Sequence, residues 1–292
     1  MKTIVFTDLD GTLLEYDTYS FRPAVPALER LRQLHIPVVF VTSKTLPEVD
    51  FWRKALDNRS PFAVENGSAV FVPVGDPPLS ERTARLCDGY EMVELGVPYP
   101  DLTRALKGAA HESGCRIRGF ADMTAEEITR ECEMPLEQAV LAKVRQYDEP
   151  FRMLKGDPGT LARALERRGL KLSSGGRFFH VTGRNDKADA VLLLIDAYRQ
   201  LGPIRSIGLG DGLNDSGFLN LVDHPILLDS PSVGQLLKRV PRARTAPAGP
   251  SGWNEAILGI LDRHFDEGAP VGDCANVTER EFGTPEICTR EA

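Results

Sequence analysis

The fold is decided by the stretch Thr3-Ile4-Val5-Phe6-Thr7-Asp8-Leu9-Asp10-Gly11-Thr12. Its first five residues form an apolar run typical of a strand, and an acidic loop turned by glycine follows at once. In an open parallel sheet, ligands bind outside the carboxyl ends of the strands. Asp8 and Asp10 would repel each other there unless a cation or a shared proton lay between them. A simple turn after a strand is the alternative interpretation.

Strands and helices alternate in both the first and the last third of the chain. Pro23 to Leu34 has helical spacing, whereas Ile36 to Val41 is a continuous apolar run typical of a strand buried on both faces. This alternation predicts a parallel sheet covered by helices. The strands expected in it are 3–7, 36–41, 62–64, 69–72, 204–209 and 226–228, and the helices are 23–34, 46–56, 186–200, 216–221, 233–240 and 253–265.

The middle of the chain has another rhythm. Residues 72–80 contain three prolines and a glycine, as linkers do. The more polar segment that follows has strand candidates at 91–95, 116–120, 151–154 and 177–181 and helix candidates at 101–112, 124–132, 136–145 and 158–168. We therefore predict an α/β protein with a Rossmann-like parallel-sheet core domain (1–80 and 184–265) and an inserted α+β cap domain (81–183). Residues 266–292, rich in Gly, Pro and charge, are predicted to be a flexible tail.

Composition narrows the function classes. The chain is 42% hydrophobic and 26% charged, as is typical of soluble globular proteins. Its net charge of −7 argues against a nucleic-acid partner. Five widely spaced cysteines without C-x-x-C favour a reducing cytoplasm. No signal peptide is evident, and the longest apolar run, Ala190 to Ile195, is too short to span a bilayer, so we expect no membrane association.

A second acidic loop, Gly210-Asp211-Gly212-Leu213-Asn214-Asp215, follows the predicted buried strand 204–209. Alone it could be a loop leading to a helix N-cap. Two acidic strand ends in one sheet instead predict an oxygen-lined metal site, which suits Mg²⁺ together with a substrate phosphate. A small phosphorylated substrate is compatible with the negative net charge because a metal or a few local cations can outweigh it.

Two further segments could bind phosphate. Thr42-Ser43-Lys44 ends the strand 36–41 and offers hydroxyls and backbone N–H groups, although such residues are often only a helix cap. Lys187 begins a predicted helix. A lysine there is usually a solvated surface charge, but beside a magnesium–phosphate site it is the natural counter-charge of a phosphoryl group.

These motifs together resemble the haloacid dehalogenase superfamily of phosphatases. Asp8-x-Asp10-Gly11-Thr12, Thr42, Lys187 and Gly210-Asp211-x-x-Asn214-Asp215 occur in that family's order, and the insert lies where Cof-type members carry an α/β cap. The resemblance implies a two-step phosphoryl transfer in which Asp8 is the nucleophile and Asp10 the acid and base. It also implies Mg²⁺ held by Asp8, Asp10 and Asp211, with Asp215 close or water-linked, and phosphoryl oxygens held by Thr42 and Lys187.

Other segments are similar to the mannosyl-3-phosphoglycerate phosphatase family. They are Ser43-Lys44-Thr45, Glu65-Asn66-Gly67-Ser68, Gln146 to Phe151, Gly175 to Phe178 and Gly249-Pro250-x-Gly252-Trp253-Asn254-Glu255. This similarity implies hydrolysis of a small phosphorylated sugar acid, mannosyl- or glucosyl-3-phosphoglycerate, to the glycosylglycerate. The motifs do not separate the two sugars, and they leave the oligomeric state open.

The substrate-binding candidates are Ser43, Lys44, Glu65, Asn66, Arg177 and Asn214. Arg177 could bind the glycerate carboxylate in a bidentate manner, or it could be a surface arginine. Glu65 and Asn66 could contact the substrate or the hinge of the cap. His180, in an apolar strand, is interpreted as a structural histidine.

Three alternative functions stay open. The first is another sugar-phosphate phosphatase of the same architecture, acting on sucrose, trehalose or hexose phosphate. The second is a phosphomutase, which would use the same aspartyl-phosphate. The third, from a different class, is a signalling module that carries a phosphoacceptor aspartate, although such a module needs neither Asp10 nor the cap.

Overall fold

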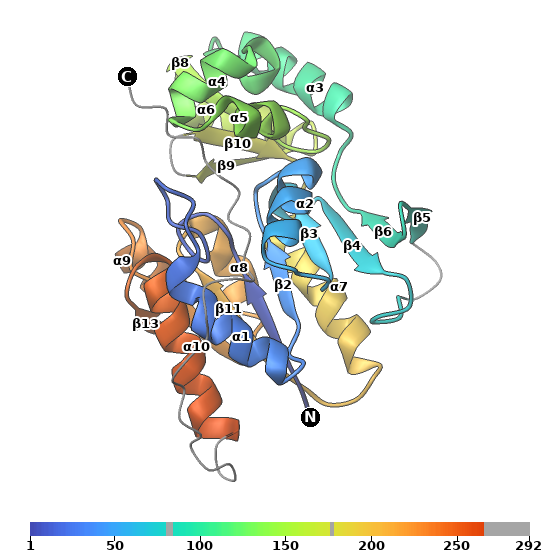
Figure 1. The fold of residues 1–292 in the computed structure, drawn as a ribbon. Helices are drawn as coiled ribbons and strands as arrows, with labels where there is room; N and C mark the ends of the chain where they lie inside the picture. The colour runs from blue at the N-terminus through green and yellow to red at the C-terminus, as the bar shows by residue number, and fades with distance from the viewer. Residues whose placement is uncertain (80–83, 176–177, 266–292) are drawn as a thin grey trace.

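The computed structural model describes residues 1–79, 84–175 and 178–265. The candidate Arg177 and the predicted tail at 266–292 lie outside the described residues. The described residues form two units. The larger one is a nine-stranded sheet covered by helices, and the smaller one, built on a four-stranded sheet, lies above it (Figure 1). In the described part of the chain, no helix is long and apolar enough to cross a membrane.

The large sheet has the strand order β13-β12-β11-β1-β2-β3-β4-β6-β5. At its centre, β1 (Lys2–Thr7) pairs in parallel with β11 (Ile204–Gly210) and with β2 (Val38–Val41). This parallel centre confirms the α/β fold predicted from the sequence. The other strands are β3 (Phe62–Val64), β4 (Ala69–Pro73), β5 (Arg85–Cys87), β6 (Tyr90–Glu94), β12 (His224–Leu228) and β13 (Arg244–Ala246).

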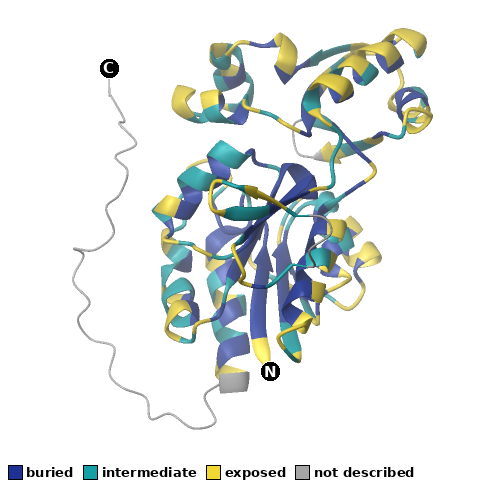
Figure 2. Cartoon of the chain, turned by 90° about the vertical axis from the view of Figure 1, so that its right-hand side faces the viewer, coloured by how far each residue is buried: buried dark blue, intermediate teal, exposed yellow. Residues whose placement is uncertain are grey.

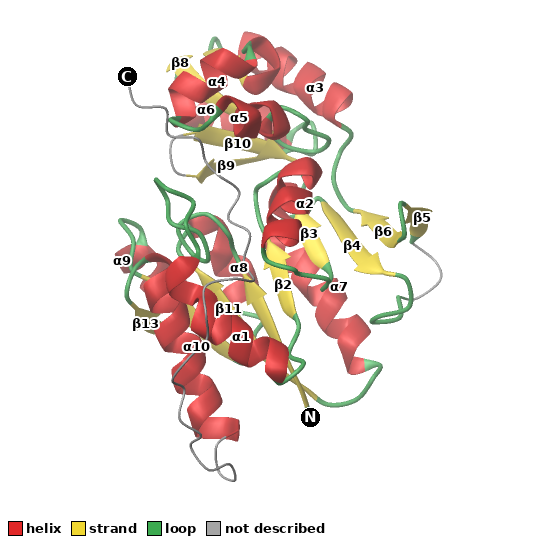
Figure 3. Ribbon diagram, viewed as in Figure 1, coloured by secondary structure: helices red, strands yellow, loops and turns green. Residues whose placement is uncertain are grey.

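Helices cover both faces of this sheet, because its strands are apolar on both sides (Figures 2 and 3). Val5 of β1 belongs to one core cluster, and its neighbours Ile4 and Phe6 belong to the other. The first face is covered by α1 (Val25–Gln33), α2 (Leu46–Ala55) and α10 (Gly249–Phe265), and the second by α7 (Lys187–Arg199), α8 (Ser216–Leu219) and α9 (Val233–Arg239).

The smaller unit, from Tyr99 to Thr182, is called the cap here. Its antiparallel sheet has the order β7-β8-β10-β9, formed by β7 (Arg116–Gly119), β8 (Glu149–Lys155), β10 (Phe178–Thr182) and β9 (Lys171–Gly175). One face packs on α3 (Tyr99–Glu112) and α6 (Pro158–Glu166), and the other packs on α4 (Ala125–Cys132) and α5 (Leu136–Ala142). Short 3₁₀ turns occur at Arg22–Ala24, Glu65–Gly67, Phe120–Asp122 and Leu213–Asp215.

Some strands differ from the sequence-based expectation. The strand expected at 91–95 in the inserted unit is β6, which pairs with β4 in the large sheet instead. Its Met92 and Val93 enter the two opposite core clusters of that sheet, so burial on both faces draws it there. The strands β5, β9 and β13 were not predicted, because they are short and largely polar or exposed. The domain boundaries at 81 and 183 stay a prediction.

Candidate active site

Three strand ends meet at one edge of the large sheet. Thr7 pairs with both Leu209 of β11 and Phe40 of β2, so the chain leaves these strands at the same level. The backbone N–H of Asp8 donates to the carbonyl of Leu209 at 3.0 Å, which fixes the start of the acidic loop beside β11. The two acidic loops and the Thr42 segment that the sequence pointed to are therefore neighbours.

A carboxylate cluster forms where the acidic loops approach each other. Asp8, Asp211 and Asp215 each offer an oxygen within 4.8 Å of the others. Thr12 donates its hydroxyl to Asp211 at 2.8 Å. Gly11 has φ +74°, and a Cβ there would lie only 2.6 Å from Oδ2 of Asp211. Glycine is therefore required at this position, because any side chain would push the two loops apart.

Lys187 is the counter-charge inside this cluster. Its Nζ lies 2.9 Å from Asp8 Oδ2 and 2.7 Å from Asp215 Oδ1, and its side chain is fully buried. Burial would lower the pKa of Lys187, but the charges of Asp215 and Asp8 outweigh it and hold the pKa above its ordinary value. Asp186 caps α7 by accepting from the N–H of Ala188 at 2.8 Å, so Lys187 stands on the first turn of a fixed helix.

The cluster carries more negative charge than Lys187 can neutralise. Burial raises the pKa of Asp8 to about 6, although Lys187 opposes this shift. Burial, followed by the charges of Asp215 and Asp8, raises the pKa of Asp211 to about 8. Oxygen ligands crowded in this way suit a divalent cation, which would stabilise all three carboxylates in their ionised form.

Asp10 lies beside this cluster. Its Oδ1 is 2.9 Å from Nζ of Lys44, which is nearly buried and also stands 3.6 Å from Glu48. The ammonium group of Lys44 lies 4.9 Å from the ring centroid of Tyr19. Lys44, predicted as a substrate ligand, thus holds Asp10 in place at the mouth of the site.

The segment after β2, which the sequence predicts to bind phosphate, joins the same edge of the sheet. Thr42 is fully buried, and its hydroxyl accepts from the backbone N–H of Lys44 at 3.2 Å. The carbonyl of Ser43 accepts from the guanidinium of Arg145 in the cap at 3.0 Å. Thr45 caps α2 and also donates to the carbonyl of Leu141 in the cap at 3.0 Å. This segment therefore connects the core to the cap.

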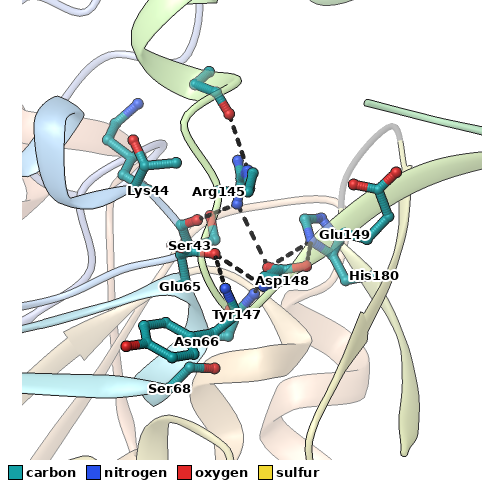
Figure 4. Close-up of polar contacts among 12 residues, drawn as sticks. Ser43, Lys44, Glu65, Asn66, Ser68, Arg145, Tyr147, Asp148, Glu149 and His180 are labelled. Carbon is teal, nitrogen blue, oxygen red and sulfur yellow. Dashed lines mark hydrogen bonds and ion pairs between the residues drawn. The ribbon is translucent and has the colours of Figure 1, made fainter. Parts of the chain in front are cut away.

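Glu65 is hydrogen-bonded to the backbone of the cap (Figure 4). Its carboxylate accepts from the N–H groups of Gln146, Tyr147 and Asp148 at 2.8 to 3.1 Å. Burial raises the pKa of Glu65 to about 7, against the opposing effects of Arg145 and the N–H donors. The contacts place Glu65 at the core–cap junction.

Asn66 is the link between the junction and the acidic loop. Its Nδ2 donates to Asp148 of the cap at 2.7 Å, and its Oδ1 accepts from Asn214 at 3.0 Å. Asn66 has φ +59°, a left-handed conformation that asparagine tolerates better than most residues. Two predicted substrate candidates, Asn66 and Asn214, are thus bonded to each other.

Sequence reasoning missed two residues of this junction. Arg145 lies 3.7 Å from Asp148, and both side chains are nearly or fully buried. The sequence singles out Asp148 only within the segment Gln146 to Phe151, which is expected to line the cap, and gives it no role of its own. No periodicity or spacing marks either residue, because both owe their position to the contact between two separate units.

Comparisons with known proteins agree with this geometry. A family model described as haloacid dehalogenase-like hydrolase matches residues 5–85. A glucosyl-3-phosphoglycerate/mannosyl-3-phosphoglycerate phosphatase of Methanococcoides burtonii is 37% identical over 272 residues, which cover 90% of this chain and 99% of that protein. The chain belongs to the haloacid dehalogenase-like hydrolases.

Further relatives support the same membership. A mannosyl-3-phosphoglycerate phosphatase of Pyrococcus furiosus is 36% identical over 229 residues, covering 78% of this chain and 91% of that protein. Among solved structures, a haloalkanoate-superfamily phosphatase of Bacteroides thetaiotaomicron has a TM-score of 0.63 at 18% identity, covering 89% of this chain and 95% of that one. This last likeness concerns the fold. The protein is therefore an enzyme of this family. Its architecture of a core and a cap also occurs in the solved structure.

Proposed function

We propose that this hydrolase is a Mg²⁺-dependent phosphatase of a glycosyl-3-phosphoglycerate, with Asp8 as its nucleophile. The observation that carries the proposal is the buried cluster of Asp8, Asp211 and Asp215 around Lys187. The substrate class rests on the names of relatives that align with nearly the whole chain.

The donor set fits Mg²⁺. Asp8, Asp211 and Asp215, together with the loop at Asp10, would hold the ion, which supplies positive charge so that an anionic phosphate can approach an anionic carboxylate. Thr12 orients Asp211 through the 2.8 Å hydrogen bond. Asp215 in turn accepts from the N–H groups of Asp211 and Gly212 at 3.1 and 2.8 Å, which fixes the loop.

The residues divide the reaction between them. Asp8 attacks phosphorus, and the bond from phosphorus to the leaving oxygen breaks, which leaves an aspartyl-phosphate. Asp10, held by Lys44, gives its proton to the leaving oxygen and then takes one from the water that hydrolyses the intermediate. Lys187 and the Thr42 segment bind the phosphoryl oxygens as charge develops on them.

The leaving group, the glycosylglycerate part of the substrate, would lie between the cap and the core. The cap is bonded to the core through Glu65, Asn66 and Ser43, so its lower face is held over the strand ends. A phosphorylated sugar acid would be enclosed between the two units, which excludes water from the transfer step.

A phosphate-release screen with Mg²⁺ tests the proposal. We expect kcat/KM on mannosyl- or glucosyl-3-phosphoglycerate to exceed that on sucrose, trehalose or hexose phosphates by roughly 10²-fold or more, because buried polar groups reject substrates that leave them unpaired. Comparable values on all of these compounds would overturn the substrate assignment while leaving the phosphatase assignment in place. If the enzyme released no phosphate from either mannosyl- or glucosyl-3-phosphoglycerate, the substrate assignment would be wrong.

A further inference from the structure

A cavity of about 340 Å³ lies between the cap and the core. Its core side includes Lys187 and Asn66, and its cap side includes Ser173 and Thr182. Lys187, one of the lining residues, also lies 2.9 Å from the proposed nucleophile Asp8. Its polar lining suits the non-phosphorylated part of a sugar acid.

His180 is a neighbour of two cap residues that line this cavity, Ser173 and Thr182. It is the direct partner of Ser173 in the antiparallel pairing of β10 with β9. Side chains alternate along a strand, so His180, Ser173 and Thr182 share one face. Val181, between His180 and Thr182, lies on the opposite face, within the cap's own core.

The imidazole of His180 is anchored by a buried carboxylate (Figure 4). Its Nδ1 lies 3.0 Å from both oxygens of Asp148, which is fully buried and also accepts from Asn66. Burial would raise the pKa of Asp148, but His180, Arg145 and Asn66 outweigh it and hold the pKa below its ordinary value. Asp148 is therefore an ionised anchor that accepts from Nδ1–H.

The other ring nitrogen of His180 is available. Across the part of the chain that the structure describes, Nε2 has no hydrogen-bond partner, and the side chain is 14% exposed. The two lysines that line the cavity are engaged elsewhere, because Lys187 pairs with Asp8 and Lys171 pairs with Asp186 at 2.8 Å. Arg239, on the core helix α9, also lines the cavity. On the cap side, where Lys171 is paired, His180 is the basic side chain with a free nitrogen that can serve a ligand.

We propose that His180 binds the carboxylate of the leaving group through Nε2–H and that Asp148 is its positioning residue. This inference rests on the proposed function, because the glycerate carboxylate is its ligand. A ring that donates from both nitrogens carries positive charge, so it complements an anion better than a sugar hydroxyl. The chain of contacts from Asn214 through Asn66 to Asp148 also ties this residue to the acidic loop, so cap and core position the ligand together.

Steady-state kinetics on two substrates test the assignment. The first is the glycosyl-3-phosphoglycerate, and the second is the analogue in which a hydroxymethyl group replaces the carboxylate. His180→Ala and His180→Gln should raise KM about 10- to 100-fold on the first with kcat within about threefold, because a hydrogen bond to a charged group is lost. On the second substrate, KM should not change. His111→Ala, an exposed cap histidine, is the matched control and should change nothing.

Asp148→Asn should likewise raise KM on the first substrate and leave KM on the second unchanged. Thermal melting checks that this variant folds. Equal losses on both substrates, or none in the His180 variants, would overturn the proposal. Calorimetric binding of the product glycosylglycerate, which requires no turnover, separates this inference from the proposed function. If wild type and His180→Ala bind the product equally, or neither binds it, the carboxylate site is wrong even where turnover is normal.

Discussion

Asp8 has contacts that suit both roles proposed for it, nucleophile and metal ligand. Its Oδ1 accepts from the backbone N–H of Leu9 at 2.7 Å, and its Oδ2 faces Lys187 at 2.9 Å. These two contacts hold the carboxylate in one orientation, which is what attack on a bound phosphate requires. The carboxylate cannot be replaced by an amide without losing both its charge and its nucleophilic oxygen.

Asp8→Asn should therefore lower kcat by more than about 10³-fold while the fold is kept. Phosphate release under saturating substrate measures the rate, and circular dichroism checks the fold. Asp196→Asn, which changes an exposed carboxylate on α7, is the control and should retain full activity. Residual activity above a tenth of wild type in Asp8→Asn would contradict the nucleophile assignment.

Glu65 should make stability depend on pH. Its pKa is about 7 in the folded protein against an ordinary 4.5, so the folded state holds the proton more tightly than the unfolded chain does. Its contribution to stability is therefore fully present below pH 4.5 and is lost as pH rises towards 7, by about 3 kcal/mol at most.

Denaturant unfolding of wild type and Glu65→Gln at pH 5 and pH 8 measures this effect. The free energy of unfolding of wild type should fall, relative to that of the variant, between the two pH values. The comparison with glutamine cancels the titration of the other groups. Parallel stability curves for the two proteins would contradict a raised pKa at Glu65.

At the scale of elements, α10 contacts the end of β1, where the loop that carries Asp8 begins. The indole N–H of Trp253 donates to the hydroxyl of Thr7 at 3.0 Å, and that hydroxyl donates to the carbonyl of Asp8 at 2.8 Å. The sequence indicated a packing helix at Trp253, and the buried ring bears this out. The structure adds that the helix also reaches the end of β1 through a polar contact.

Trp253→Phe should lower the free energy of unfolding by about 1 kcal/mol more than Trp52→Phe does, because only the first loses a hydrogen bond. Trp52 is the matched control, since it is also buried in the same core cluster and its indole N–H has no partner among the described residues. Urea unfolding of both variants measures the difference. Equal losses would show that Trp253 acts through packing alone.

At the scale of the whole molecule, we expect the acidic loops to make the stability of the fold depend on a bound cation. Three carboxylates share one buried lysine, and burial with its anionic neighbours raises the pKa of Asp211 to about 8. Ionised Asp211 therefore opposes folding at pH 8 unless a cation is present. A cation that binds only the folded state would stabilise it by mass action.

Thermal melting at pH 8 tests this dependence. Without metal, Asp211→Asn should melt at or above the temperature of wild type, because it removes a repelled charge. Mg²⁺ should raise the melting temperature of wild type by several degrees and that of Asp211→Asn by much less. The same rise in both proteins would mean that the ion binds elsewhere.

The sequence by itself determined the fold class and the acidic loops. Apolar runs such as Ile36 to Val41 and the acidic residues after them are local patterns, and parallel pairing brings such strand ends to one edge. The same local patterns predict that Asp8, Asp211 and Lys187 lie near one another. They fail for β13 and β9, whose pairing depends on neighbours in space and hardly on their own apolar content.

Only the tertiary structure decided how the cap joins the core. Asp148 carries no local signal, yet it meets Asn66 from a segment 82 residues away. His180 looked structural in its apolar strand, and its face became known only when β10 paired with β9. The first contact joins two units that have separate cores, and the second joins two strands within the cap, so no sequence periodicity encodes either of them. The sequence thus specified the acidic cluster proposed to react, and the packing of cap on core decided which side chains face it.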